Sequence, residues 1–161
     1  MSDSAARMWE DFTASGSPLA PDAARAGYSA WHFGSGGEMA DELASLVLEG
    51  AKRATAGAQW AYDAEGDELP EVGDYSVILD GSGEAACIIR TAHVDIVPFN
   101  AVDAEFAAAE GEGDLSLEYW REGHWRYITM DLASWGLKPS EDMPIVCERF
   151  EVVWPPEAAD R

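Results

Sequence analysis

The chain has 161 residues, of which 47% are hydrophobic, so it is long enough for one domain and too apolar to be disordered. Its 31 acidic and 10 basic residues give a formal net charge of −21, which argues against a broad nucleic-acid-binding surface. A small basic pocket is still compatible with this charge, because salt screens exposed charges beyond about 8–10 Å.

The N-terminal part of the chain is predicted to be a helix followed by a loop. The helix spans residues 3–15, and its apolar side chains recur at helical spacing: Met8, Trp9 and Phe12. Residues 15–30 are rich in Gly, Ser, Pro and Ala, which is typical of a linker or wrapping loop. We expect this part either to cover the rest of the domain or to mediate a homodimer.

The best-specified helix lies between residues 35 and 50. Ser35 and Glu38 have capping-box spacing, and Gly50 is the kind of residue that ends helices in the left-handed conformation. The apolar positions between them recur at helical spacing: Met39, Leu43, Leu46 and Val47. The preceding residues 31–34 are either a short strand or an aromatic plug. Lys52 is therefore expected just beyond the helix C-terminus, where the macrodipole favours a cation.

The remaining elements alternate strands with helices. A polar loop is predicted from Trp60 to Asp74. Strands are predicted at 75–79, 85–90, 93–97 and 145–154, with a hairpin turn at 80–83. Helices are predicted at about 101–110 and at 116–135. Asn100 is expected to cap the first of them, with Asp103 at the supporting position. This order predicts an α+β fold, in which mostly antiparallel strands form a small β-barrel with flanking helices.

Lys52 and Thr55 are the first candidates for chemistry. Lys52 is one of two lysines in the chain, and Thr55 follows it three residues later. An amine and a hydroxyl on one short turn can act as a base and a nucleophile. The alternative is an ordinary surface lysine followed by a threonine at a strand start. Catalysis requires Lys52 to lose its proton, which burial or a nearby cation such as Arg53 would favour.

Two further groups of charged residues are candidates. Glu110 and Glu112 lie in a predicted acidic loop, where they are either solvated charges or carboxylates that orient Lys52 or shuttle a proton. The densest basic cluster contains three residues: Arg121, His124 and Arg126. These side chains either pair with neighbouring glutamates or line a groove for a phosphate or a base, with aromatic rings as stacking surfaces.

Localisation and cofactors are predicted from what the sequence lacks. No apolar run approaches the ~20 residues needed to span a bilayer, and residues 1–4 do not resemble a signal peptide. We therefore expect a cytoplasmic protein without a membrane partner. Cys87 and Cys147 lie in apolar runs and are expected to be buried, reduced thiols. The three histidines are scattered and match no metal-binding motif, so we expect no metal and no other cofactor.

Several segments together resemble the ASCH family, whose members have a PUA-like β-barrel. The family signature is Gly-x-Lys-x-x-Thr, here Gly50, Lys52 and Thr55. The similarity includes six further segments: residues 31–34, 40–44, 72–76, 110–114, 116–121 and 140–144. The predicted organisation is an N-terminal helix and wrapping loop at 1–30, an ASCH domain at 31–154 and a tail at 155–161.

The resemblance implies a cleft beside the lysine and binding of RNA or a modified nucleoside. Some family members are amidohydrolases that deacetylate N4-acetylcytidine with a lysine, a threonine three residues later and a glutamate. Lys52 and Thr55 match directly, and Glu110, followed by Glu112, is the best match for the glutamate. Other members are described as ribonucleases, and many only as RNA-binding. Many members carry an arginine where this chain has Gly57, which puts the transfer of their substrate in question.

Three functions are considered. In the first, the protein is a metal-free amidohydrolase of a small acylated nucleoside: Thr55 attacks the acyl carbon, Lys52 takes and returns the proton, and Glu110 positions Lys52. In the second, it is a ribonuclease or a binding module for single-stranded RNA. In the third, it is a regulator that binds a nucleotide-like ligand without turnover. The net charge favours the first function, because a neutral nucleoside is not repelled.

Substrate contacts are predicted from six residues: Arg53, Trp60, Glu112, Arg121, His124 and Arg126. Replacement of Lys52 by Met is expected to abolish hydrolysis while leaving the melting temperature nearly unchanged. The sequence thus predicts a protein that hydrolyses RNA or modified nucleosides, with N4-acetylcytidine-type deacylation favoured.

Overall fold

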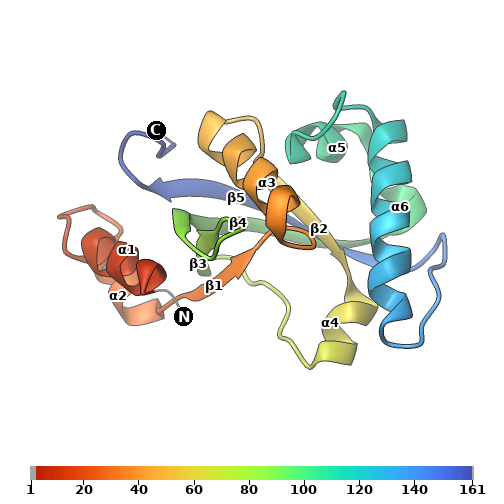
Figure 1. Ribbon diagram of the computed structural model, residues 1–161, viewed down its shortest axis with the longest axis horizontal. Coiled ribbons are helices and arrows are strands. Elements are labelled where there is room, and N and C mark those ends of the chain that lie inside the picture. The colour runs from red at the N-terminus through yellow and green to blue at the C-terminus, as the bar shows by residue number, and fades with distance from the viewer. Residues whose placement is uncertain (1–2, 161) are drawn as a thin grey trace.

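The computed structural model describes residues 3–160, which form a five-stranded sheet with helices packed against it (Figure 1). The strands lie in the order β1 (Ser29–His32), β3 (Tyr75–Leu79), β4 (Ala85–Pro98), β5 (Pro144–Trp154) and β2 (Ala54–Ala58). β1 runs parallel to β3, and the other neighbouring pairs are antiparallel. Since β1 and β2 are the two edges of this order, the expected barrel is a half-barrel that stays open between them.

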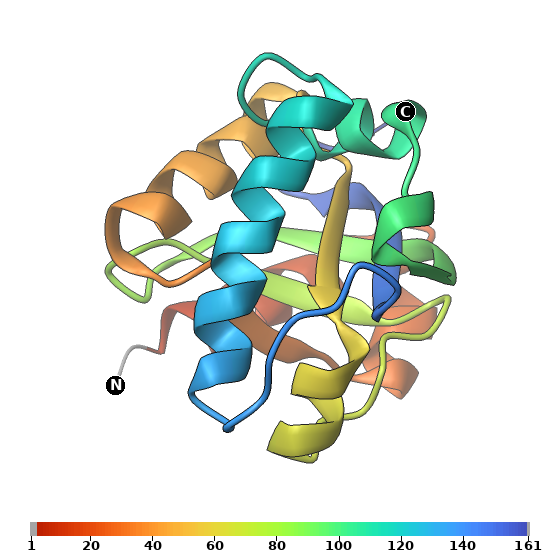
Figure 2. The same ribbon diagram turned by 90° about the vertical axis from the view of Figure 1, so that its right-hand side faces the viewer.

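Helices cover the sheet at both ends and across its middle. They are α1 (Ser4–Thr13), α2 (Ala20–Ala26), α3 (Gly37–Glu49), α4 (Gln59–Glu65), α5 (Ala104–Glu110) and α6 (Leu117–Ala133), with a 3-10 turn, η1, at Phe99–Ala101. α1 and α2 lie at one end, α5 and α6 lie at the other, and α3 lies between them (Figures 1 and 2). Within residues 3–160, no helix has both the length and the apolar character needed to cross a membrane.

Three clusters of buried apolar side chains hold the helices to the sheet. Phe12 of α1 is fully buried in a cluster with residues of β3 and β4, so the N-terminal helix covers the sheet, as one of the two alternatives predicted. α3 buries Leu43 and Val47 in a second cluster. α5 and α6 bury Phe106 and Trp120 in the third, which also contains residues of β2 and β5.

Two segments predicted as loops contain helices. Residues 15–30 include α2, and residues 60–74 begin inside α4. Each of these helices has seven residues, about two turns, which is too short to show a clear apolar period in the sequence. Both short helices contribute to the lining of one cleft: Ala26 of α2, and Ala61, Tyr62 and Glu65 of α4.

Helix ends and one strand also differ from the prediction. α3 has no capping box, since the Ser35 hydroxyl donates to the Met39 sulfur, but Gly50 ends the helix at φ 92° as predicted. α5 is capped by the Asp103 carboxylate and not by Asn100, which lies in η1. The strands predicted at 85–90 and 93–97 are one continuous strand, β4, whose register against β5 shifts twice.

Candidate functional site

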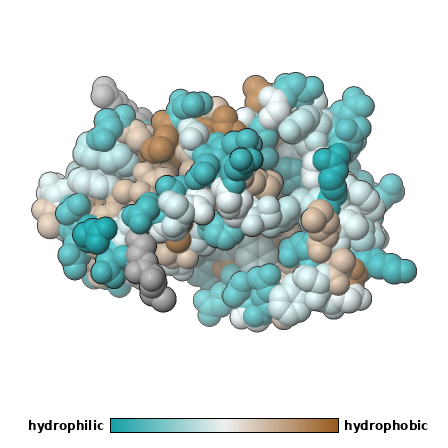
Figure 3. Space-filling model, viewed as in Figure 1, coloured by the Kyte–Doolittle hydropathy of each residue, from teal (hydrophilic) through white to brown (hydrophobic). Residues whose placement is uncertain are grey.

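A cleft of about 900 Å³ lies between the two edge strands of the half-barrel. Its floor carries polar side chains from four strands: Thr55 of β2, Ser76 of β3, Thr91 of β4 and Glu148 of β5. The last three of these are buried, and Thr55 is half-buried. Figure 3 shows the surface hollowed between β1 and α4, with hydrophilic side chains along the rim. The volume lies within the range of about 300–1,000 Å³ that is usual for small-molecule sites.

The lining of this cleft is acidic and aromatic. Its carboxylates belong to Glu65, Asp67, Glu68, Asp74, Asp131 and Glu148. Its rings belong to Tyr28, Trp31, Tyr62, Tyr75 and Tyr127. No lysine or arginine is among the described residues that line it. A phosphate group would therefore meet repulsion in the cleft, whereas an uncharged planar ring would find stacking surfaces.

Glu148 and Thr55 lie side by side on the cleft floor. They are directly paired across β2 and β5, so their side chains leave the same face of the sheet. The Thr91 hydroxyl donates a hydrogen bond of 2.6 Å to Oε2 of Glu148. Burial raises the pKa of the Glu148 carboxyl, and although the Thr91 hydrogen bond acts in the opposite direction, the net pKa lies above its ordinary value.

At Gly57, where the resemblance described above implies an arginine, Tyr62 fills the space. A Cβ built at Gly57 would lie 3.3 Å from Cε2 of Tyr62. Burial, with a smaller contribution from Glu148, raises the pKa of Tyr62 to about 12. The phenol is therefore neutral at pH 7 and can donate a hydrogen bond into the cleft.

Lys52 is the centre of a buried ionic network beside the start of β2. Its side chain is 1% exposed, which excludes the alternative of a surface lysine. The ammonium group donates to Oε2 of Glu112 at 2.9 Å, to Oε1 of Glu110 at 3.2 Å and to the Ala54 carbonyl at 2.8 Å. The Phe33 ring lies 5.1 Å from the same nitrogen. The neighbouring polar atoms are all acceptors, which is the surrounding that a three-donor ammonium group needs.

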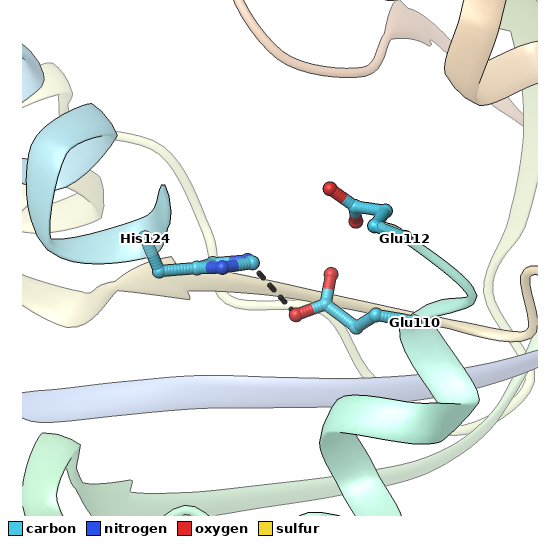
Figure 4. A group of neighbouring side chains, drawn as sticks. All are labelled: Glu110, Glu112 and His124. Carbon is cyan, nitrogen blue, oxygen red and sulfur yellow. Dashed lines mark ion pairs between the residues drawn. The ribbon is translucent and has the colours of Figure 1, made fainter. Parts of the chain in front are cut away.

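The second half of this network joins α5 to α6. Glu110 is the last residue of α5, and its Oε2 accepts hydrogen bonds from the Trp120 indole and from Nε2 of His124, the latter at 2.9 Å (Figure 4). Nδ1 of His124 lies 2.9 Å from the Trp120 carbonyl oxygen. Since both ring nitrogens face acceptors, the geometry requires both to donate, as in a protonated imidazolium. Two cations and two carboxylates then balance one another in the protein interior.

The pKa values of the two partners are shifted in the directions this pairing requires. Burial alone would lower the pKa of His124, but the Glu110 carboxylate outweighs it, so the net pKa lies above its ordinary value. Burial alone would raise the pKa of Glu110, but the charges of His124 and Lys52 hold it below its ordinary value.

Gly111 allows the glutamate-bearing segment to lie against Lys52. It adopts a φ of 72°, and a Cβ at this position would come within 2.3 Å of the Ala51 carbonyl oxygen. The Arg53 amide also donates to the Ala109 carbonyl at 2.8 Å. The end of α5 is thereby fixed to the strand that carries Thr55.

Glu110, Glu112 and His124 could also be read as a metal site, because their ligand atoms lie within 4.8 Å of one another. The Lys52 nitrogen, however, lies 3.2 Å and 2.9 Å from the two carboxylates. A divalent cation would have to displace this ammonium group and would require a deprotonated His124. The arrangement is an ion-pair network rather than a metal centre while Lys52 points into it.

Of the two features expected to favour a catalytic Lys52, the structure shows burial of the side chain but, among the described residues, no cation beside the amine. The nearest charges are carboxylates, and Arg53, expected to assist, turns its guanidinium to Asp160 at 2.8 Å and to the Val47 carbonyl at 2.8 Å. Among the described residues, no hydrogen bond joins Lys52 to Thr55. Lys52 therefore holds the start of β2 in place through its contacts with Glu110, Glu112 and the Ala54 carbonyl.

The predicted site residues fall into three groups. The structure brings Lys52, Glu110, Glu112 and His124 together and places Thr55 in the cleft. Trp60 packs against the apolar cluster under α5 and α6, and neither it nor Arg53 is among the residues that line the cleft. Arg121 and Arg126 lie on a separate groove along α6, so the predicted basic cluster is split.

Sequence reasoning missed Glu148, Thr91 and Tyr62. Glu148 gave one signal, because it is an acidic residue within the apolar run of the closing strand. An acidic residue there is either on the solvent face or a buried functional group, and only the strand pairing distinguishes the two. Tyr62 gave no signal, since the helix that carries it was not predicted.

The His124–Glu110 pair predicts a pH dependence of stability. Because the pKa of folded-state His124 is raised, its contribution to stability is complete below about pH 6.5, the unfolded value, and is lost as the pH rises through the folded-state pKa. Thermal melts of wild type and His124→Gln should therefore converge as the pH is raised from about 6.5. The exposed His93→Gln serves as a control. A difference that grows with pH would contradict the pairing.

Comparison with known proteins shows the family. The ASCH domain model matches residues 29–154. The structure is similar to the crystal structure of an ASCH domain from Lactobacillus crispatus JV V101, with a TM-score of 0.88 and 31% identity over 96% of this chain and 97% of that chain. It is also similar to a protein from Enterococcus faecalis V583, with a TM-score of 0.80 and 37% identity over 95% of this chain and 90% of that one. No curated protein matches the chain. The chain therefore belongs to the ASCH domain family.

Proposed function

We propose that the protein hydrolyses an amide on a modified nucleoside bound in the cleft between β1 and β2, with Thr55 as the nucleophile. The observation that carries this proposal is the cleft itself, in which a threonine hydroxyl lies among carboxyl groups and aromatic rings, without a lysine or arginine among the described lining residues. Such a site suits an uncharged, planar ligand. N4-acetylcytidine, the substrate implied by the family resemblance, has this character.

The charge of the cleft favours a nucleoside over an RNA strand. Binding of nucleic-acid polymers depends mainly on cations that neutralise phosphates. Six carboxylates line the cleft instead, in a protein whose formal net charge is −21. A nucleoside without phosphate avoids this repulsion and still offers a base for stacking on a tyrosine or tryptophan ring.

The reaction is an acyl transfer through Thr55. The threonine oxygen attacks the acyl carbon, the amine leaves with a proton, and water then hydrolyses the Thr55 ester. Lys52 acts as a positioning residue, because its bonds to Glu110 and Glu112 fix the backbone three residues before Thr55. This role needs the charged lysine that the network contains.

The test is turnover of N4-acetylcytidine by the purified protein. We expect cytidine and acetate as products, at a rate that changes little between low and high salt, because no phosphate contact contributes to binding. Single-stranded RNA should bind weakly or not at all. Absence of product together with tight, salt-sensitive RNA binding would overturn the proposal.

A second function, RNA binding, is favoured by the groove along α6. This groove has a volume of about 750 Å³ and is lined by Arg121, Arg126, Trp125 and Phe99, among others. It thus combines two of the chain's ten basic residues with aromatic rings, alongside Glu122 and Glu141. If RNA binds and the joint replacement Arg121→Gln with Arg126→Gln abolishes the binding, α6 is the functional surface. If that variant binds RNA like wild type, the groove is not the site.

A further inference from the structure

We propose that Glu148 is the general base and general acid that serves Thr55 in the cleft, a role that rests on the amide hydrolysis proposed above. The assignment follows from the position of the carboxyl on the cleft floor, from its pairing with Thr55 and from the engagement of Lys52 elsewhere. Glu148 does not belong to the signature of the family or to the ionic network.

The geometry places one carboxyl and one hydroxyl on the same patch of sheet. Glu148 and Thr55 are direct partners in the β2–β5 register, and both line the cleft. Directly opposed residues on one sheet face have Cβ atoms about 4.5–5.5 Å apart, which is within reach of a hydrogen bond between a glutamate and a threonine. Thr91 engages Oε2 of Glu148 and so orients the carboxyl. Among the described residues no hydrogen bond joins Thr55 to Glu148, so the proposed step requires Oε1 to approach the Thr55 hydroxyl by side-chain rotation.

Lys52 is a poor candidate for the same role. Its amine donates to two carboxylates and to the Ala54 carbonyl within 3.2 Å. Taking a proton from Thr55 would require Lys52 first to release a proton to this network and then to turn away from it. Glu148 already lies on the cleft floor beside Thr55 and, among the described residues, is not held in an ion pair.

The surroundings of Glu148 suit a group that both accepts and returns a proton. The groups that face it are the Thr91 hydroxyl from β4, the Thr55 hydroxyl from β2, Tyr62 from α4 and Asp74, which precedes β3. Burial and the charge of Asp74 raise the pKa of Glu148, while the Thr91 hydrogen bond lowers it. A carboxyl with a pKa above its ordinary value is a stronger base, and a pKa closer to the working pH suits a group that must both accept and return a proton.

The proton and the bonds balance over the cycle. Glu148 takes the proton of Thr55 as the threonine oxygen bonds to the acyl carbon. When the carbon–nitrogen bond breaks, the protonated Glu148 gives this proton to the departing amine. A water molecule then attacks the Thr55 ester, Glu148 takes a proton from the water, and the proton passes to the Thr55 oxygen as the carboxylic acid is released. One amide and one water give one acid and one amine.

The first test compares three variants in turnover of N4-acetylcytidine. Glu148→Gln keeps the size of the side chain and its contact with Thr91, and we expect kcat to fall by about 10²–10⁴-fold with KM and Tm little changed. Glu148→Asp retains a carboxyl and should recover part of the activity. Glu151→Gln, three positions along the same strand and 43% exposed, is the matched control and should behave like wild type.

The second test is how the turnover rate depends on pH. If Glu148 had only a structural role, variants that alter its pKa would not shift this dependence. The rate should rise with pH as Glu148 loses its proton. Thr91→Val removes the hydrogen bond that lowers the pKa of Glu148, so this acidic limb should shift to higher pH. Asp74→Asn removes a charge that raises the pKa, so the limb should shift to lower pH. Shifts in opposite directions support the assignment.

The outcomes separate this inference from the function on which it rests. If wild type releases cytidine and Glu148→Gln does so equally fast, Glu148 is not the base and the hydrolase proposal stands. A pH limb that stays in place in both Thr91→Val and Asp74→Asn overturns the assignment as well. If folded wild type releases no product from N4-acetylcytidine, both proposals fall together.

Discussion

Lys52→Met is expected to lower the free energy of unfolding by roughly 3–5 kcal/mol, as removal of one partner from a buried ion pair does. The side chains of Glu110 and Glu112 are 2% and 20% exposed, and both pair with the Lys52 ammonium group, while Glu110 pairs with His124 as well. Their negative charges would be left with His124 alone. This result would differ from the nearly unchanged melting temperature expected from the sequence alone, because two carboxylates would lose a cationic partner.

Thermal and denaturant unfolding of Lys52→Met measure this effect. Lys138→Met removes the other lysine of the chain, which is exposed, and should change stability by no more than about 0.5 kcal/mol. Adding Glu110→Gln to Lys52→Met should restore part of the lost stability, because it removes one of the negative charges that lost Lys52 as a partner. Equal melting temperatures for Lys52→Met and Lys138→Met would show that the buried network contributes nothing.

Thr55→Val is expected to abolish hydrolysis while leaving the fold intact. Removal of a nucleophile costs on the order of 10⁴-fold or more in rate. Valine has the shape of threonine and an equal preference for strands, so β2 should keep its pairing with β5. The loss should therefore appear in turnover of N4-acetylcytidine, with little change in Tm and with binding of the nucleoside retained.

Thr13→Val provides the control for this experiment. The Thr13 hydroxyl bonds to carbonyl groups of its own helix, outside the cleft, so its replacement should leave turnover unchanged. If Thr55→Val hydrolyses N4-acetylcytidine like wild type, Thr55 is not the nucleophile. A water molecule activated directly by a carboxyl would then be the simplest remaining mechanism.

Local sequence signals predicted most of the fold. The strand at 75–79, the closing strand and the helix carrying His124 lie where their apolar patterns and turn residues indicated. These elements are long or sharply bounded, so local pattern is sufficient. The open edge of the half-barrel was not predicted, because the order of strands depends on contacts between residues far apart in the chain.

The sequence indicated several residues of the ionic network but not the contacts between them. Lys52 and Glu110 are 58 positions apart, and their contact depends on how α5 packs against β2. His124 was expected in a basic cluster with Arg121 and Arg126. It turns inward because it lies one helical turn after Trp120, which is buried, and both side chains converge on Glu110. Glu148 depends on a strand register that no local pattern contains.

A crystal structure of Thr55→Val with N4-acetylcytidine tests the central claim most directly. The account predicts a nucleoside in the cleft between β1 and β2, with its acyl carbon about 3–3.5 Å from the position of the Thr55 oxygen. It predicts the Glu148 carboxyl beside the same carbon. A nucleoside seated instead on the groove of Arg121 and Arg126, or an empty cleft at saturating concentration, would contradict it.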